Sequence, residues 1–245
     1  MKNELTWMIG GPQGSGVETA ANIFSQVYSK MGYHVFGKRE YYSNIKGEHS
    51  YFAVRISDKK IRSSVNGTNI LIAFDAETIF RHADDVLKDG IIIYDSDIEK
   101  AKVTDVFTLE NDFKQRLLEF LKSKNKQDSV RDVLELASEN GVQTFPVSFR
   151  GVLSDLSAQI DNPRLKGMVR MFNVLGVSFS LGILKCPMVL IHNAIESIFS
   201  RKKSIAEINK QASTFAYNYA TAKFTDIDYS LETKQVESNT MLVQG

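Results

Sequence analysis

One cysteine, Cys186, is present among the 245 residues of the chain. A single thiol can form no intrachain disulfide. It also cannot by itself hold an iron–sulfur cluster, which needs several cysteine ligands. This sparse cysteine usage is typical of a cytoplasmic protein. Because Cys186 precedes Pro187 at the end of an apolar segment, we expect a buried small residue rather than a nucleophile.

Net charge and long apolar runs are also nearly absent. The formal net charge is +1, which argues against nucleic acid as the main partner. The longest apolar stretch, 174–184, is too short to span a membrane and is interrupted by glycine and serine. The first residues show no charged and then apolar signal pattern. We therefore expect no nucleic acid and no membrane among the partners.

The motifs of common catalytic and metal sites are missing as well. The four histidines form no H-x-x-x-H pattern, and neither C-x-x-C nor G-x-S-x-G occurs. The sequence thus predicts no metal site and no catalytic residue in this chain. We infer a domain that binds part of a substrate while the chemistry takes place elsewhere.

What the chain does have is 43% hydrophobic residues, enough for a full core. It opens with an apolar run, 5–9, then the glycine-rich stretch Gly10–Gly16, then a helical pattern. This order predicts a strand, a tight turn and a helix. Glycines at 11, 14 and 16 allow positive φ and a close approach to the backbone. The helix would direct free N–H groups at an anion such as phosphate over the turn.

The turn matches no nucleotide-binding fingerprint completely. In the pattern G-x-G-x-x-G, Gly14 and Gly16 fill the first two positions, but Thr19 stands at the third. A Walker A ending is absent, and no acidic residue ends a convincing strand about twenty residues later, where a ribose would be bound. The turn alone leaves phosphate binding and a merely tight connection open. It favours a phosphate or coenzyme A-like ligand over NAD.

The stretch Lys38–Ser50 follows the next predicted strand, 33–37, and is polar, basic and aromatic with little periodicity. Loops of this kind after a parallel strand are where α/β proteins place ligands. A solvated loop with its tyrosines folded onto the core is the alternative. The residues that would complement phosphate or stack on an adenine are Lys38, Arg39, Lys46, Tyr41 and Tyr42.

Strand and helix patterns alternate along the chain. Apolar runs at 51–57, 69–74, 91–94 and 141–147 predict further strands, with helices between them. By the handedness rule, the first two strands should be parallel. The pattern predicts an α/β fold: a Rossmann-like, doubly wound, mostly parallel sheet with flanking helices. We expect one domain over 1–224 with a helical insertion at about 110–140, and a tail or linker over 225–245.

Several local predictions are more specific. Asp75 and Asp95 each end a strand, where helix capping is favoured over acid–base or metal chemistry. A helix is predicted over 76–87, and 61–65 is predicted to pair with 51–57 as a hairpin. Ser204 is predicted to cap the last helix.

Together, three features resemble the gamma-type domain of the 2-oxoacid:ferredoxin oxidoreductases. They are the turn Gly10–Gly16, the loop Arg39–Ser50 with Ser43-Asn44-Ile45-Lys46-Gly47, and the segment Asn173–Leu184 with the helix that closes the fold. The likeness covers most of 1–224 and is closest to the form fused at the N-terminus of the alpha subunit. The glycine turn alone is common, whereas the turn plus the stretch 42–51 is much more specific.

The resemblance implies a multi-subunit enzyme. These enzymes oxidatively decarboxylate a 2-oxoacid, pass electrons through iron–sulfur clusters to ferredoxin, and transfer the acyl group to coenzyme A. Thiamine diphosphate lies between pyrimidine-binding and pyrophosphate-binding domains, which would be this chain's partners. Thiamine diphosphate, magnesium and the clusters belong to the complex outside this chain. The gamma domain is implied to contribute to coenzyme A binding and subunit packing and to be inactive alone.

Some residues carry over individually. The resemblance implies Gly14, Ser15 and Gly16 as backbone donors near the ligand, and Lys46 and Gly47 where the family often has a basic residue and a glycine. Glu48 replaces what is often a second glycine. The predicted cofactor-binding set is Gly11, Gly14, Ser15, Gly16, Lys38, Arg39, Tyr42, Asn44, Lys46 and Gly47.

Two other functions stay open at this point. One is a purely structural subunit whose glycine turn only packs against partner chains. The other is a stand-alone Rossmann-type nucleotide-binding protein, against which the missing third glycine and the missing ribose-binding acid count.

Overall fold

The fold is seen in a computed structural model, which describes residues 3–41, 49–225, 227, 229 and 231. Its strands are β1 (Glu4–Pro12), β2 (His34–Tyr41), β3 (His49–Ser57), β4 (Thr68–Ala73), β5 (Val86–Asp95) and β6 (Gln143–Val147). Its helices are α1 (Val17–Lys30), α2 (Ala76–His82), α3 (Asn111–Ser123), α4 (Val130–Glu139), α5 (Phe149–Gln159), α6 (Phe172–Ile183), α7 (Met188–Ile198) and α8 (Lys203–Lys223).

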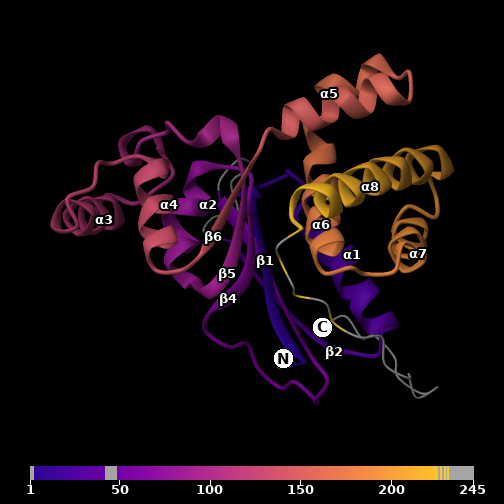
Figure 1. The fold of residues 1–245 in the computed structure, drawn as a ribbon, viewed down its shortest axis with the longest axis horizontal. Helices are drawn as coiled ribbons and strands as arrows, with labels where there is room; N and C mark the ends of the chain where they lie inside the picture. The colour runs from indigo at the N-terminus through magenta and orange to yellow at the C-terminus, as the bar shows by residue number, and fades with distance from the viewer. Residues whose placement is uncertain (1–2, 42–48, 226, 228, 230, 232–245) are drawn as a thin grey trace.

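These strands form one sheet in the order β2-β3-β1-β4-β5-β6 (Figure 1). The pairs β1–β4, β4–β5 and β5–β6 are parallel, and β3 runs antiparallel to both of its neighbours, β2 and β1. The predicted mostly parallel α/β sheet is therefore confirmed. The first two strands do run in the same direction, but they are not neighbours, because β3 is inserted between them.

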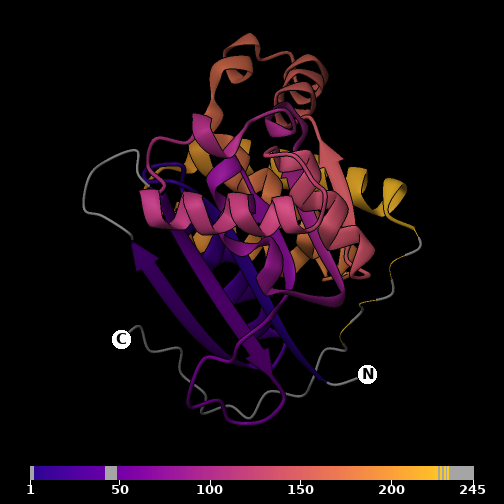
Figure 2. The same cartoon turned by 90° about the vertical axis from the view of Figure 1, so that its left-hand side faces the viewer.

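Helices cover both faces of the sheet. In Figure 1, α1, α6, α7 and α8 lie on one side and α2 and α4 on the other, with α3 farther out. Turned by 90°, the molecule shows α3 and α4 in front of the strands (Figure 2). Each layer has its own apolar core, one including Trp7 and Phe24 and the other including Leu71 and Ile79. The two-sided cover explains the continuous apolar runs of the central strands, which must be buried on both faces.

Helix α6 is enclosed completely. All twelve of its residues are buried, between the sheet and α8. Its small residues permit this, because a Cβ on Gly176 would lie 3.0 Å from Ile72, and one on Gly182 would lie 2.9 Å from the Tyr217 carbonyl oxygen. The glycine and serine pattern of this apolar segment thus serves close packing, not a membrane. In the described part of the chain, no helix has both the length and the apolar character needed to cross a membrane.

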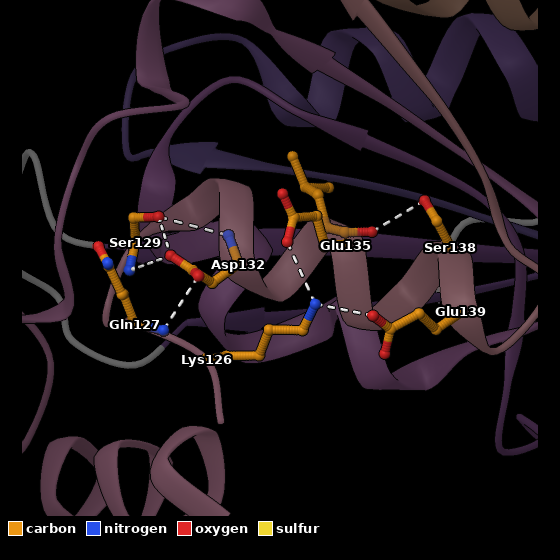
Figure 3. A network of polar contacts seen from close by, with 8 residues as sticks. Lys126, Gln127, Ser129, Asp132, Glu135, Ser138 and Glu139 are labelled. Atoms are coloured by element: carbon orange, nitrogen blue, oxygen red, sulfur yellow. Dashed lines mark hydrogen bonds and ion pairs between the residues drawn. The ribbon is translucent and has the colours of Figure 1, made fainter. Parts of the chain in front are cut away.

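The connection from α3 to α4 is fixed by polar contacts (Figure 3). Ser129 and Asp132 form a capping box at the start of α4, as the side chain of each binds the other's backbone N–H. Lys126 reaches along the helix to Glu135 at 3.1 Å and Glu139 at 2.7 Å. The predicted helical segment at about 110–140 is therefore α3 and α4, of which α4 packs against α2 on the sheet.

Some local predictions are confirmed. Asp75 caps α2 by accepting a hydrogen bond from the Thr78 backbone N–H at 2.9 Å. Asp95 accepts one from Asp97 in the same way at 3.3 Å, at the start of a short 3-10 turn. Cys186 is fully buried, and burial raises the pKa of its thiol to about 12. Such a thiol is a packing residue, as predicted, and not a nucleophile.

Other local predictions are wrong. Helix α2 ends at His82, not at residue 87, because the chain passes through a 3-10 turn into β5 at Val86. Residues 61–65 form no strand, since β3 already pairs along both of its edges, with β1 and β2. Helix α8 begins at Lys203, so Ser204 lies inside it, and no side chain caps this end.

Candidate functional site

The glycine turn leaves the carboxyl end of β1, where the chain changes direction across the sheet. β1 lies between β3 and β4. From β1 the chain continues into α1 on one face, and from β4 it continues into α2 on the other face (Figure 1). In open α/β sheets, ligands bind in the crevice that forms at such a point. The fold thus places the turn where a ligand site is expected.

The backbone of the turn has the predicted form. The Ser15 N–H donates to the Pro12 carbonyl oxygen at 3.0 Å, and Gly14 and Gly16 have φ of 92° and 91°. Gly16 is the N-cap of α1, and no side chain caps that end. The N–H groups of the first helical turn have no partner inside the helix. The turn therefore presents backbone donors suited to an anion.

Gly11 has a different role from the two turn glycines. It lies in β1, and its φ is not in the left-handed region. A Cβ at Gly11 would lie 3.2 Å from both the Phe74 ring and the Ser15 hydroxyl oxygen. The space beside Gly11 is thus filled by the chain's own side chains.

Asn173 is a residue of this site that the local sequence patterns did not identify. It lies at the start of α6, is only 6% exposed, and donates from Nδ2 to the Gly16 carbonyl oxygen at 3.2 Å. A Cβ on Gly16 would lie 2.1 Å from the same Nδ2 atom. The only local signal was a single amide at the start of an otherwise apolar helix. Asn173 therefore joins α6 to the turn across 157 residues of sequence.

The hydroxyl of Ser15 is the unsatisfied polar group of the turn. Its Oγ atom is buried and makes no hydrogen bond to any of the residues that the structure describes. A buried hydroxyl without a partner costs free energy, so such a group calls for an explanation. Ser15 thus retains unused hydrogen-bonding capacity within the turn.

Lys38 and Arg39 lie within β2 and not in the loop predicted to begin at Lys38, because the strand continues to Tyr41. The strand also separates their side chains. Successive side chains of a strand point to opposite faces. Arg39 reaches the first turn of α1, where its Nη1 lies 2.6 Å from Glu18 Oε2. Lys38 instead forms an ion pair with Glu40. The structure therefore brings Arg39, but not Lys38, to the glycine turn, and each cation is matched by a carboxylate.

The remaining predicted binding residues, Tyr42, Asn44, Lys46 and Gly47, lie outside the described residues. Within the part that is described, no three histidine, cysteine or acidic side chains gather closely enough to hold a metal ion. The described residues thus form a glycine turn with backbone donors at the uncapped start of α1 and the Arg39–Glu18 ion pair beside it.

Comparison with known proteins identifies the family of this chain. The model of the family described as pyruvate ferredoxin/flavodoxin oxidoreductase matches residues 6–219. The chain belongs to this family. It is 36% identical over 243 residues to the alpha subunit of 2-oxoacid:ferredoxin oxidoreductase 1 from Sulfurisphaera tokodaii. That alignment covers 98% of this chain and 38% of the relative, so the chain spans well under half of the relative's length.

Solved structures show the same fold at low sequence identity. A 2-oxoglutarate:ferredoxin oxidoreductase from Magnetococcus marinus, with 2-oxoglutarate, coenzyme A and succinyl-CoA bound, superposes with a TM-score of 0.66 at 15% identity, covering 96% of this chain and 34% of that one. The gamma subunit of a keto/oxoacid ferredoxin oxidoreductase from Geobacter sulfurreducens gives 0.57 at 16%, covering 89% and 99%. The pyruvate ferredoxin/flavodoxin oxidoreductase fold of this chain thus matches nearly all of a separate gamma subunit.

Proposed function

We propose that this chain is the gamma-type domain of a 2-oxoacid:ferredoxin oxidoreductase, of the form fused at the N-terminus of an alpha subunit. The complete enzyme would oxidise and decarboxylate a 2-oxoacid, reduce ferredoxin and form an acyl-CoA. This chain would bind coenzyme A and pack against the pyrimidine-binding and pyrophosphate-binding domains, which hold thiamine diphosphate and magnesium. Iron–sulfur clusters would also lie outside it. The lone buried cysteine supports a cytoplasmic location.

The uncapped N-terminus of α1 is the observation that carries this proposal. Coenzyme A contains a pyrophosphate, and backbone N–H groups at a helix N-terminus favour such an anion. The side chains of Phe74 and Asn173 fill the space beside Gly11 and Gly16, whereas Gly14 is exposed. The phosphates would therefore approach from the side of Gly14. Ser15, Arg39 and Lys46 would add donors and positive charge.

Isothermal titration of coenzyme A into the chain, alone and with the other domains of the enzyme added, tests the proposal. We expect saturable binding in at least one setting, weakened about tenfold by Lys46→Ala because a phosphate contact is lost. Lys203→Ala, which removes a lysine at the start of α8, is the matched control and should leave the affinity unchanged. If the complex forms but coenzyme A binds in neither setting, the proposed role of this chain in coenzyme A binding is rejected.

A second prediction concerns Glu18, which stands in the first turn of α1 and is paired with Arg39. Glu18→Gln removes a negative charge beside the proposed phosphate site and releases the guanidinium. We expect coenzyme A to bind about threefold to tenfold more tightly, since both changes favour an anion. The double variant Glu18→Gln/Arg39→Ala should lose most of that gain. Weaker binding by Glu18→Gln would show instead that Glu18 positions Arg39 for the ligand.

A structural role without ligand is the second candidate function. It is favoured by the way the chain's own side chains occupy the glycine turn, with Phe74 beside Gly11 and Asn173 beside Gly16. In that case the chain would join the complex and contribute only packing. Assembly with the partner domains in the absence of any coenzyme A binding would establish this role.

A further inference from the structure

Two buried histidines contact each other on the face of the sheet that α2 covers, opposite to α1. His49 begins β3 and His82 ends α2, and their exposed fractions are 1% and 4%. Their rings are stacked with centroids 5.3 Å apart, and the two Nε2 atoms lie 3.1 Å apart. At this distance the nitrogens share one hydrogen bond, which needs one donor and one acceptor.

A carboxylate fixes which ring donates. His82 Nδ1 lies 3.1 Å from Asp85 Oδ2, and an ionised carboxylate only accepts, so we assign the hydrogen of the neutral ring to Nδ1. Its Nε2 then carries a lone pair, and the shared hydrogen belongs to His49 Nε2. The hydrogen bonds thus run in one direction, from His49 to His82 to Asp85. A further proton on His49 would place a positive charge in this buried pair, near Arg81.

Charged and titratable groups from α2 and β2 lie near the pair. Arg81 and the buried carboxyl of Asp75 come from α2 and its cap, where burial raises the pKa of Asp75. Glu77 on α2 is paired with Arg81. From β2, Glu40 is paired with Lys38 and accepts from the Tyr51 hydroxyl, whose ring packs edge-on against His82 at 4.4 Å. Burial, and then the electrostatic effects of His82 and Arg81, lower the pKa of His49 to about 3.

The pair lies directly behind the glycine turn. His49 is opposite Pro12 in the β1–β3 register, and Ser50 is opposite Gly11. Pro12 in turn accepts the hydrogen bond that closes the turn. His49, the first residue of β3, pairs with the end of β1 and contacts His82 at the end of α2. The His49–His82 contact therefore connects the end of β1 to the end of α2.

We propose that the His49–His82 hydrogen bond is a pH-sensitive latch that holds the start of β3 against α2 while His49 is neutral and releases it in acid, when His49 takes up a proton. Release would loosen the pairing of His49 with Pro12 and so the turn itself. An effect of this release on coenzyme A binding rests on the proposed function, but the latch itself does not. If a released His49 has its ordinary pKa of 6.5, the opening constant rises about 30-fold between pH 8 and pH 5.

Hydrogen exchange of the β3 amides near His49 in the full chain, corrected for intrinsic rates, tests the latch. We expect protection to fall by about 30-fold between pH 8 and pH 5 in the wild type. It should stay constant in His49→Gln, whose amide still donates to His82 but does not titrate. His34→Gln, which removes an exposed imidazole from β2, should behave as the wild type. Equal pH dependence in the wild type and His49→Gln overturns the proposal.

A second variant guards against misfolding of His49→Gln. Asp85 is half exposed, so Asp85→Asn leaves the core intact. The amide of this variant can donate as well as accept, so it no longer holds the hydrogen of His82 on Nδ1, and protection near His49 should fall already at pH 8. Nitrogen NMR of the imidazoles should show the hydrogen on Nδ1 of His82 and on Nε2 of His49. The opposite tautomers in the wild type, or unchanged protection near His49 in Asp85→Asn at pH 8, also overturn the latch.

Coenzyme A titration separates the latch from the proposed function. Wild type and His49→Gln are compared at the same pH, because the phosphates of coenzyme A titrate themselves. We expect the wild type to lose affinity relative to His49→Gln at pH 5.5 and to match it at pH 8. If coenzyme A does not bind at any pH, the proposed coenzyme A binding is rejected. The hydrogen-exchange result still tests the latch. Equal affinities at both pH values exclude coupling between the two.

Discussion

Replacing Gly16 with alanine is expected to destabilise the chain by about 3 kcal/mol. Two independent causes contribute. Gly16 has a φ of 91°, in the left-handed region that disfavours a side chain. In addition, the new Cβ would lie 2.1 Å from Nδ2 of Asn173, so the turn or the start of α6 has to move. Since Asn173 also binds the Gly16 carbonyl oxygen, the contact between turn and helix would be lost as well.

Urea unfolding of the variant, followed by circular dichroism, measures this loss. Gly167→Ala is the control, because nothing lies within 4 Å of a Cβ there and the backbone is not left-handed. Adding Asn173→Ala to Gly16→Ala removes the clash, so it should recover the stability lost to steric overlap. The loss caused by the left-handed backbone should remain, which separates the two causes. A change in Gly16→Ala no larger than in Gly167→Ala would contradict the geometry of the turn.

Replacing Arg81 with methionine is expected to cost about 3–5 kcal/mol of unfolding free energy, because it leaves a buried carboxylate without its partner. The side chains of Arg81 and Glu77 are 4% and 6% exposed, and they form a 2.8 Å ion pair within α2. Arg81 also binds Glu110 at 2.7 Å, which ties α2 to the start of α3. Removal of the guanidinium thus breaks the contact between α2 and Glu110 and leaves the buried Glu77 carboxylate with the hydroxyl of Thr108 but without its cation.

The double variant Arg81→Met/Glu77→Gln shows which effect dominates. We expect it to be more stable than Arg81→Met alone, since no charge remains buried and unpaired. Arg150→Met is the comparison at the surface, where the partner Asp97 is 3.8 Å away and both side chains are more than half exposed. It should change the melting temperature little. If Arg81→Met melts like Arg150→Met, Glu77 carries no buried charge.

Local patterns predicted the elements around the glycine turn well. The apolar run before Gly10, the left-handed glycines and the helical stripe after Gly16 depend on neighbours in sequence, so the strand, turn and helix followed directly. The capping role of Asp75 followed for the same reason. Likewise, the unbroken apolar runs predicted central strands, because only strands covered on both faces need them.

What the sequence did not predict depends on residues that are distant along the chain. Nothing local to β3 shows that it enters the sheet between β1 and β2, so 61–65 was wrongly given to it as a partner. The contact of Asn173 with Gly16 crosses 157 residues, and that of His49 with His82 crosses 33. A search for histidines at helical spacing cannot find such a pair, since tertiary packing alone brings the two rings together.

The enclosure of α6 has a consequence for synthesis on the ribosome. Trp7 in β1, stacked on Phe24, donates its indole N–H to Ser180 in α6 at 2.8 Å, across 173 residues. Until α6 has emerged from the exit tunnel, α1 covers this face of the nascent sheet without the helix that completes its core. The core on this face is therefore completed only after a helix that lies 173 residues further along the chain has been synthesised. A break in the gene before α6 would leave neither piece able to complete its core.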